Sequence, residues 1–567
     1  MAQIGIKLSA DWFRSDIASR QVQQQVVWQS FEQSAGFCCY ELAQWQLYVW
    51  GDVAQRSQDP LIIQALVQQQ PLSIFGRSWI AIHRNTAQLQ GATDQLGIFP
   101  ILLQQNATDW LVCSDRPMLT QLSGNAPTLS ADAMRQLLCF GQILDQQSIL
   151  QGAQHLAAAR HFILQNNQLT VKSLEQRKPL CESHPSNFEQ ALEAVVETVR
   201  LSLHHAVNPM LSLSGGLDSR LIFAACLAIG KKIPALCYGE AHSDDVRIAK
   251  QLAQVGAIPL FTGYKQNLEP CWQVSKRISQ IGLGEVPMHH AHALVNGSLL
   301  EQTQHSTVLT GTGAEAYRAF YYDRGMPGFE FFDMPCLHNL CWPRIQRYIR
   351  EEFFKLATPM FAIVPQLEMM VRPVFEATLA SQLQQDVDCA RAADQFYLDV
   401  RVCRMVVAGQ QLLDPFYQRS HPFLAPEVLS AIGNLPAHYK VSSRFHRQAI
   451  MRLAPQLGQI PWDKTGLPLT VGLPLANRYP GLMRYVGRPA RYGKQAIPMF
   501  SQFNSQQLPY EHVLDCILRY IGIEDEKLRR RQIWQLLQSK VLPHVKGLTE
   551  VWSHLLTEQP ASLGARP

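Results

Sequence analysis

The strongest constraint on this chain is one short segment in which an apolar strand meets two glycines and then a helix. The segment reads Leu211-Ser212-Leu213-Ser214-Gly215-Gly216-Leu217-Asp218-Ser219. Glycine lets the backbone approach a phosphate closely, and a helix start offers unpaired N–H groups and the positive end of its dipole. Asp218 would repel a bare phosphate, so the pattern predicts Mg²⁺ between its carboxylate and the phosphates. The segment therefore predicts a nucleotide phosphate site.

Short apolar strands alternate with helical segments around this turn. We expect strands at Met210–Leu213, Ile233–Tyr238, Ile258–Phe261 and Thr307–Thr310, and helices at Phe188–Val207, Leu217–Ile229 and Asp245–Val255. Such alternation is typical of a parallel α/β sheet, which binds its ligand at the carboxyl ends of its strands. We include Tyr238, at the end of one of these strands, among the candidate nucleotide contacts.

The rest of the chain has different patterns of apolar and polar residues. The residues up to about Leu174 hold short apolar runs broken by polar residues and glycine, which predicts a β-rich unit. The runs are Trp45–Trp50, Trp79–His83, Gly97–Leu103 and Trp110–Cys113. A polar stretch from Gln176 to Asn187 is the expected linker, and the chain after Phe329 is expected to be mostly helical, with loops at Pro415–Pro426 and Pro461–Pro474. The predicted domains are residues 1–175 and 188–567.

A second glycine motif, Gly311-Thr312-Gly313-Ala314-Glu315-Ala316, follows the expected strand Thr307–Thr310. Taken alone it fits the G-x-G-x-x-A fingerprint of dinucleotide-binding proteins, with Glu330 or Asp333 at about the right distance for a ribose contact. An NAD(P)-dependent oxidoreductase therefore competes with the first interpretation. A further glycine segment, Gly487–Lys494, departs from a Walker A loop in its spacing and lacks the final Ser or Thr.

The segment Leu213–Ser219 resembles the pyrophosphate-binding loop of the asparagine synthetase family and of related N-type ATP pyrophosphatases. These enzymes split ATP between the α and β phosphates, form an acyl-adenylate and then an amide. The resemblance implies a PP-loop ATP pyrophosphatase fold, similar to adenine nucleotide α-hydrolases, with ATP and Mg²⁺ as cofactors.

The resemblance also assigns roles in the second motif. Gly311 would contact the nucleotide, and Glu315 stands where the family has a Mg²⁺-binding Asp, so Asp218 and Glu315 would hold the metal. Tyr321 matches the last residue of the family's motif, and Thr312 replaces an acidic or aromatic residue; both are candidate catalytic positions. Lys464, in Pro461–Gly466, resembles the lysine that reaches the α-phosphate during adenylation.

In the N-terminal part, Asp94-x-x-Gly97-x-x-Pro100 and then Cys113-Ser114-Asp115 resemble the family's glutaminase domain, an Ntn-like β-sandwich. Members that use glutamine have Cys directly after Met, but this chain has Ala2. Cys38 and Cys39 lie elsewhere and are expected to be buried. The sequence thus predicts the sandwich fold without glutaminase activity.

Family members with this change include β-lactam and carbapenam synthetases and lasso peptide cyclases, which adenylate a carboxylate that an amine of the same molecule attacks. The resemblance implies an AMP-forming amide synthetase, with a peptide macrolactam as the preferred product. Its partners would be a peptide or small molecule carrying the carboxylate and amine, with a precursor-peptide protease as a further candidate. An ammonia-dependent asparagine synthetase is a further alternative, whereas the intact Asp218, Ser219 and Lys464 argue against a scaffold without turnover.

Composition and charge narrow the classes of protein to which this chain can belong. The 567 residues are 47% hydrophobic and 17% charged, which is ordinary for globular proteins, and a net charge of +5 is too weak to predict nucleic-acid binding. No apolar run has the ~18 residues that a membrane span needs, so we expect a cytoplasmic protein without a membrane partner. The 13 scattered cysteines predict reduced thiols. His289, His290 and His292 are weak metal candidates, and His289, Glu351 or Glu352 could serve as the base for the amine.

Overall fold

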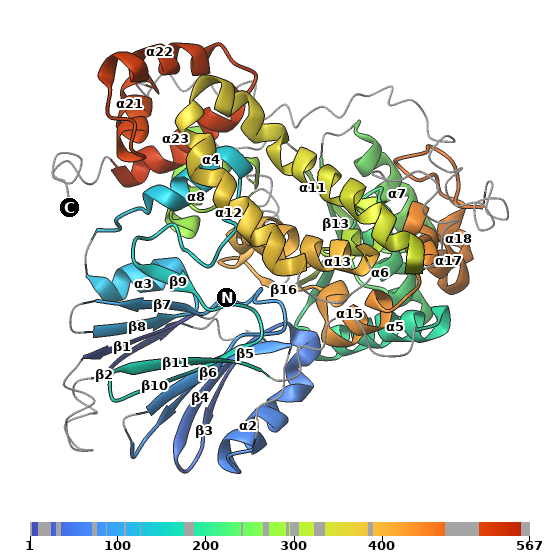
Figure 1. The fold of residues 1–567 in the computed structure, drawn as a ribbon. Coiled ribbons are helices and arrows are strands. Elements are labelled where there is room, and N and C mark those ends of the chain that lie inside the picture. Colours follow the sequence, from blue (N-terminus) through green and yellow to red (C-terminus); the bar gives the residue numbers. More distant parts are fainter. Residues whose placement is uncertain are drawn as a thin grey trace.

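The computed structural model describes residues 3–9, 24–29, 36–70, 76–86, 88–106, 109–124, 126–174, 186–239, 242–264, 271–290, 294, 306–322, 335–383, 389–470 and 510–556. Several sequence candidates fall outside these ranges, namely Ala2, His292, Glu330, Asp333 and the segment Gly487–Lys494. The described chain is a mixed α/β protein with two antiparallel sheets, one parallel sheet and many helices (Figure 1).

Two antiparallel sheets stack on each other in the N-terminal part of the chain (Figure 1). The first has the order β2-β1-β8-β7-β9 and the second the order β11-β10-β6-β5-β4-β3. The strands of the first sheet are β1 Gln3–Ser9, β2 Gln24–Gln29, β7 Leu102–Gln105, β8 Asp109–Cys113 and β9 Ala153–His155. Those of the second are β3 Phe37–Glu41, β4 Trp45–Gly51, β5 Arg77–His83, β6 Gln88–Ala92, β10 Arg160–Gln165 and β11 Gln168–Ser173.

Alternation along the strands explains this stacking. In β5, Ile80 and Ile82 belong to the main hydrophobic core, whereas Trp79 and Ala81 pack on the opposite face in a second cluster. Successive side chains of a strand point to opposite faces, so one face of the sheet meets the other sheet. The opposite face is covered by α2 (Asp59–Val67), which contributes Ile62 to the second cluster. The structure thus confirms that the N-terminal part contains two stacked antiparallel sheets, as a β-sandwich requires.

The alternation of side chains along a strand also explains why one of the two predictions of a buried cysteine is wrong. Cys38 is buried as expected, but Cys39 is exposed. Both lie in β3, the last strand of its sheet, and as neighbours along a strand they point to opposite faces.

The expected strand Gly97–Leu103 is wrong over most of its length, because β7 begins only at Leu102. The carboxylate of Asp94 accepts hydrogen bonds from the N–H groups of Leu96 and Phe99, at 3.0 and 2.9 Å. These bonds hold the residues after Asp94 in a turn, and Gly97 has a φ of 67°, which favours glycine.

The second half contains the predicted parallel sheet, with the order β14-β13-β12-β15-β16. Its strands are β12 Pro209–Ser212, β13 Ala235–Gly239, β14 Leu260–Tyr264, β15 Thr307–Leu309 and β16 Gln418–Ser420, and the helices between the early strands are α6 Leu217–Ala228 and α7 Asp244–Gly256. Helix α5, Phe188–His205, precedes β12 and begins with a capping box formed by Asn187 and Gln190.

Strand β16 corrects a further expectation, since it lies in the segment Pro415–Pro426, for which the sequence predicts a loop. Its three residues pair in parallel with β15, and the N–H of Gln418 donates to the carbonyl of Ser306 at 2.8 Å. A strand this short gains its hydrogen bonds from a partner more than 100 residues earlier, so local sequence does not reveal it.

The remaining helices follow the sandwich strands or fill the second half of the chain. They are α3 Arg116–Ser123, α4 Ala131–Phe140, α8 Cys271–Gly282, α11 Pro335–Ile363, α12 Pro365–Leu383, α13 Cys389–Phe396, η7 Tyr397–Val406, α14 Val407–Gln410, α15 Pro426–Gly433, α16 Ala437–Lys440, α17 Arg444–Leu453, α18 Pro455–Gly458, α21 Tyr510–Tyr520, α22 Glu526–Leu537 and α23 Leu542–Leu556. Helices α11 and α12 pack side by side and extend from the C-terminal helices across the molecule (Figure 1). Across the described ranges, no helix is both long enough and apolar enough to cross a bilayer.

The sandwich and the later elements share one buried core. The same hydrophobic cluster contains Ile80 of the sandwich, Leu211 of the parallel sheet and Trp552 of α23. Polar contacts join the same parts, as in the ion pair between Arg116 and Glu285 at 3.0 Å. The parallel sheet is therefore held by the sandwich as well as by its own helices.

Candidate functional site

The predicted phosphate turn lies at the carboxyl end of β12, the middle strand of the parallel sheet. The N–H of Ser214 donates to Ser219 Oγ at 3.0 Å, and the N–H of Gly216 donates to Ser214 Oγ at 3.3 Å. Gly216 is the N-cap of α6 and provides no side-chain cap. The strand, the glycine turn and the uncapped helix start thus occur in the order that the sequence predicts, and phosphate binding at this turn stays a prediction.

A carboxylate that the sequence prediction missed reaches this turn. Asp245, in the first turn of α7, accepts a hydrogen bond from the N–H of Gly215 at 2.9 Å. A β-carbon on Gly215 would lie 3.2 Å from Asp245 Oδ1 and 3.2 Å from the Cβ of Asp463. The space is tight enough to favour glycine, and the turn is bordered by acidic groups.

The second glycine motif touches the first. A β-carbon on Gly311 would come within 2.8 Å of the backbone nitrogen of Ser219 and 2.9 Å of the Cβ of Asp218. This contact follows from the parallel pairing of β12 with β15, in which Leu211 is opposite Leu309. Gly311 therefore packs against the start of α6. The segment after it, η5 (Ala314–Arg318), is a short 3₁₀ helix rather than the longer helix that a dinucleotide fingerprint opens.

Charged side chains gather around Asp218. Its Oδ2 lies 3.2 Å from Arg318 Nη2, and its Oδ1 lies 3.4 Å from His446 Nε2. Burial raises the pKa of Asp218 to about 7, and Glu315 adds to this rise, although Arg318 and Lys464 act in the opposite direction. Burial and the charges of Arg318 and Lys464 lower the pKa of His446 well below its ordinary value, so its imidazole is neutral.

The two predicted metal ligands fit a divalent cation in their chemistry. Asp218 Oδ1 and Glu315 Oε2 are buried oxygens that accept no hydrogen bond from any residue in the described ranges. The two carboxyl groups interact electrostatically, since Glu315 raises the pKa of Asp218. In the described part of the chain, no three His, Cys, Asp or Glu residues are grouped as a complete metal site.

Lys464 lies in a tight turn beside the same site. The N–H of Gly466 donates to the carbonyl of Trp462 at 2.7 Å, and the Nζ of Lys464 is 5.8 Å from the centre of the Trp462 ring. The charge of Lys464 acts on both Asp218 and His446, as their pKa shifts record. The structure therefore brings Lys464 together with the phosphate turn, 246 positions after Asp218 in the chain.

Arg220 explains how these two turns stay together. Its side chain is completely buried and donates to the carbonyls of Gly215 at 3.1 Å, Ile460 at 2.8 Å and Pro461 at 2.9 Å. Burial lowers the pKa of Arg220 to about 10, so it remains a cation at neutral pH. One guanidinium thus joins the glycine turn to the segment that leads into Lys464.

The other predicted site residues lie at different places. Thr312 is buried, and its hydroxyl accepts hydrogen bonds from Thr310 Oγ1, at 2.9 Å, and from Gln410. Tyr321 lies in a buried aromatic cluster, with ring centres 5.7 Å from Tyr397 and 6.5 Å from Tyr348. These contacts hold Thr312 and Tyr321 in two separate packed clusters, and none of them involves a residue of the phosphate turn.

Tyr238 lies at the carboxyl edge of β13, the strand beside β12, so it shares the edge on which the turn lies. Two of the candidate bases have partners on α11: Glu352 accepts from Tyr348 Oη at 3.2 Å, and Glu351 forms an exposed ion pair with Arg347 at 2.8 Å. The side chain of the third, His289, lies outside the described part of the chain. The metal candidate His290 packs with its ring against Gly409, where a β-carbon would lie 1.9 Å from its Nδ1.

The sequence prediction therefore missed Asp245, Arg220 and His446. Asp245 could have been suspected from its place in the first turn of the helix after β13, at the same sheet edge. Arg220 follows the motif directly, but nothing local shows that it reaches Pro461. His446 is a single histidine in a helix and has no sequence signal of its own.

No family model and no curated protein matches the chain. Among solved structures, the chain is similar to glutamine PRPP amidotransferase from B. subtilis complexed with ADP and GMP, with 9% identity and a TM-score of 0.18. That match covers 47% of this chain and 62% of the enzyme chain, which is less than two thirds of its length. A structure described as the allosteric regulatory enzyme of purine biosynthesis matches with 9% identity and a TM-score of 0.17, over 48% of this chain and 76% of its own. At these TM-scores the similarities carry no argument about fold or activity.

Proposed function

We propose that this chain is an ATP-dependent amide synthetase that releases AMP and pyrophosphate. In this proposal, residues 188–567 form a PP-loop ATP pyrophosphatase unit, and residues 1–175 form a glutaminase-like sandwich that does not hydrolyse glutamine. The observation that carries the proposal is the union of the glycine turn with the Lys464 turn through Arg220, beside Asp218 and Glu315.

The proposed chemistry has two steps. A carboxylate oxygen of the substrate attacks the α-phosphorus of ATP, the bond from that phosphorus to the bridging oxygen of the β-phosphate breaks, and pyrophosphate leaves. An amine then attacks the acyl carbon, AMP departs with the former carboxylate oxygen, and the amine loses a proton to a base. Both steps concentrate negative charge at the phosphates, so fixed cations and N–H groups lower their barriers.

The residues around the turn suit these steps. The N–H groups at the start of α6 would hold the pyrophosphate, and Lys464 would stabilise the charge that grows at the α-phosphate. Asp218 and Glu315 would hold Mg²⁺, which supplies neutralising charge to the phosphates when it is bound. Arg318, 3.2 Å from Asp218 Oδ2, would keep that carboxylate in place.

We further propose that the attacking amine belongs to the same molecule as the carboxylate, most simply within a peptide that becomes a macrolactam. Such an enzyme supplies proximity and needs no glutaminase. Two buried thiols of the N-terminal part agree with this view, because burial raises the pKa of Cys113 and Cys139. An activated cysteine nucleophile needs a lowered pKa. A β-lactam-type synthetase would share the same site.

The test follows the fate of labelled ATP. Purified protein is incubated with α-labelled ATP, Mg²⁺ and a synthetic peptide that carries a free N-terminal amine and one glutamate side chain. AMP, pyrophosphate and a product lighter by one water are expected, equally with and without glutamine. ADP as the product, or strict dependence on glutamine, would refute the proposal. A parallel reaction with aspartate and ammonium distinguishes an asparagine synthetase.

Two variants assign the roles. Lys464→Ala should still bind ATP but lose about 3 kcal/mol of transition-state stabilisation, or roughly 10²-fold in rate. Asp218→Ala should abolish adenylation. Arg531→Met changes an exposed residue of α22 and serves as the control, with turnover expected to be unchanged.

A further inference from the structure

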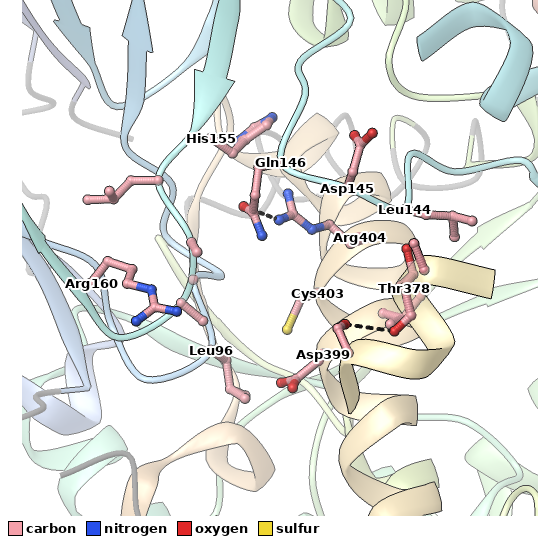
Figure 2. Close-up of a pocket in the computed structure, with 17 residues that line it drawn as sticks. Leu96, Leu144, Asp145, Gln146, His155, Arg160, Thr378, Asp399, Cys403 and Arg404 are labelled. Carbon is pink, nitrogen blue, oxygen red and sulfur yellow. Dashed lines mark hydrogen bonds between the residues drawn. The ribbon is translucent and has the colours of Figure 1, made fainter. Parts of the chain in front are cut away.

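A cavity of about 390 Å³ lies between the sandwich and the helical part of the chain (Figure 2). One wall comes from the sandwich and includes Leu96, Leu156 and Arg160. The opposite wall comes from α12, through Thr378, and from η7, through Asp399 and Arg404. A cavity of this size accommodates a small organic ligand or a short peptide segment.

Two arginines face this space from opposite walls, Arg160 from the start of β10 and Arg404 from η7 (Figure 2). Arg404 Nη2 donates to Gln146 Oε1 at 2.6 Å, which is a neutral partner. Within the described residues, neither guanidinium forms an ion pair with a carboxylate. Both side chains are partly exposed, so their charge is available to a ligand in the cavity.

The acidic groups around the cavity are occupied by other partners. Asp145 accepts hydrogen bonds from Gln136 Nε2 at 3.2 Å and from the N–H and side chain of Gln147 at 3.0 and 3.1 Å. Asp399 accepts from Gln395 Nε2 at 2.8 Å. Both acids therefore accept hydrogen bonds from side-chain amides of the protein.

His155, at the cavity wall, adds no net charge. Burial lowers its pKa, so the imidazole is neutral, and its Nε2 lies 3.4 Å from Glu285. Glu285 is already paired with Arg116 at 3.0 Å. The rest of the lining is mixed: apolar side chains such as Leu96, Leu144 and Leu156 alternate with polar ones such as Thr378 and Ser381. The cavity therefore combines two guanidinium groups and two carboxyl groups with a surface that is partly apolar.

Helix η7 links this cavity to the candidate active site. It is a ten-residue π-helix, a rare form that is often found at functional sites. Its first residue, Tyr397, packs on Phe320 at 4.5 Å between ring centres, and Arg401 lies 5.6 Å from the same ring. Gln410, in the helix that continues η7, donates to Thr312. One element thus touches both the cavity and the segment that carries Glu315.

We infer that this cavity binds an organic carboxylate with an apolar body, with Arg160 and Arg404 as its two charged contacts. The inference rests on the proposed function in one respect, because the ligand would be a second, unreacted part of the substrate of amide formation. Guanidinium groups match carboxylates in geometry, and leucine-lined surface suits an apolar side chain next to that carboxylate.

The test measures binding without ATP, so it is independent of amide formation. Cys403 lines the cavity and is partly exposed, so the rate at which N-ethylmaleimide alkylates it, followed by peptide mapping, reports on occupancy. The probes are acetyl-Leu-Leu with a free carboxylate, its C-terminal amide, and inorganic phosphate. At about ten times its Kd the acid should slow alkylation roughly tenfold, following 1 + [L]/Kd, while the amide and phosphate leave it unchanged.

Variants complete the test. Arg160→Met and Arg404→Met should each weaken protection by the acid, and Arg531→Met should retain it; circular dichroism confirms that each variant is folded. Equal protection by acid and amide, protection by phosphate but not by the peptide acid, or no protection by any probe would each overturn the inference. Loss of AMP formation with protection intact would refute the proposed function alone.

Discussion

Arg220 donates a hydrogen bond of 2.9 Å to the carbonyl oxygen of Pro461, although the two residues are 241 positions apart. The same guanidinium holds Gly215 at 3.1 Å. Arg220 therefore joins the glycine turn to the segment that leads into Lys464 through their backbone carbonyls. Arg220 is a positioning residue in the proposed reaction.

Arg220→Lys should separate positioning from binding. Lysine keeps the charge but cannot serve several carbonyls with a planar fork, so the Lys464 turn should shift. We expect the Kd for ATP to change by less than about threefold while adenylation falls about 10²-fold, as for a misplacement of about 1 Å. Equilibrium nucleotide binding and ATP–pyrophosphate exchange measure the two effects.

The matched control is Arg77→Lys, which changes a fully buried arginine of the sandwich paired with Asp59 at 2.8 Å. It should lower stability but leave exchange activity per folded molecule unchanged. Equal loss of exchange in both variants would show that Arg220 acts only through stability.

Gly311→Ala should disrupt the contact between the two glycine motifs. The added methyl group would meet the backbone nitrogen of Ser219 at 2.8 Å, and backbone has little freedom to retreat. We expect a stability loss of about 1–3 kcal/mol, with weakened ATP binding, because overpacking shifts the start of α6. Thermal unfolding and nucleotide titration measure the two effects.

Gly124→Ala is the comparison for that variant. Gly124 has a φ of 70° and open space around it, so the substitution adds backbone strain without a clash. It should cost about 1 kcal/mol and leave ATP binding intact. If Gly311→Ala behaved in the same way, the close packing of Gly311 on α6 would have no role in nucleotide binding.

The pKa of Asp218 predicts how Mg²⁺ use depends on pH. Burial raises this pKa to about 7, so below that value Mg²⁺ must displace a proton to bind the carboxylate. The affinity for Mg²⁺ in the presence of ATP should fall by about tenfold per pH unit below neutrality and become level above it. Titrations from about pH 5.5 to about pH 8.5 would measure this.

The stability of the metal-free protein should change in the same range. Since the folded state keeps this proton between the ordinary pKa of 3.8 and about 7, stability is lost as the pH rises through that window. Asp218→Asn should remove this pH dependence and weaken Mg²⁺ binding in the presence of ATP. A variant that bound Mg²⁺ with the wild-type affinity and pH profile would exclude Asp218 as a ligand.

Asp52 offers a prediction about stability alone. Its carboxylate is buried and accepts from Ala54 N at 2.9 Å, Ser420 Oγ at 2.8 Å and His421 N at 2.5 Å. Asp52→Ala would leave buried donors unpaired and should cost about 2–4 kcal/mol. The midpoint of thermal unfolding should fall clearly. Ser420→Ala removes only one of these bonds and should cost about 1 kcal/mol; equal effects would contradict this account.

The parts that could be predicted from the sequence are those built by local chemistry. The strand, turn and helix of residues 209–228 appear within a few positions of where their residue pattern places them, since glycine, serine and apolar spacing act over short ranges. Helix α5 follows from its cap and spacing in the same way. The short apolar run of β5 similarly predicts a strand, and its alternation gives the sheet two different faces.

The parts that could not be predicted depend on distant partners. Strand β16 exists because β15 is beside it, and Arg220 matters because Pro461 returns to the turn. Asp245 reaches Gly215 only once two strands lie side by side. Such contacts arise from topology, which residue spacing along one segment does not encode.

The bond from Asp52 to the backbone of His421 has a wider consequence. Asp52, which fixes the end of β16, belongs to the N-terminal part of the chain, and β16 is an edge of the sheet that carries the glycine turn. The sandwich therefore supports the parallel sheet from the side. Under the proposed function, a sandwich without glutaminase activity would still be needed, because removing it would leave this sheet edge without that support.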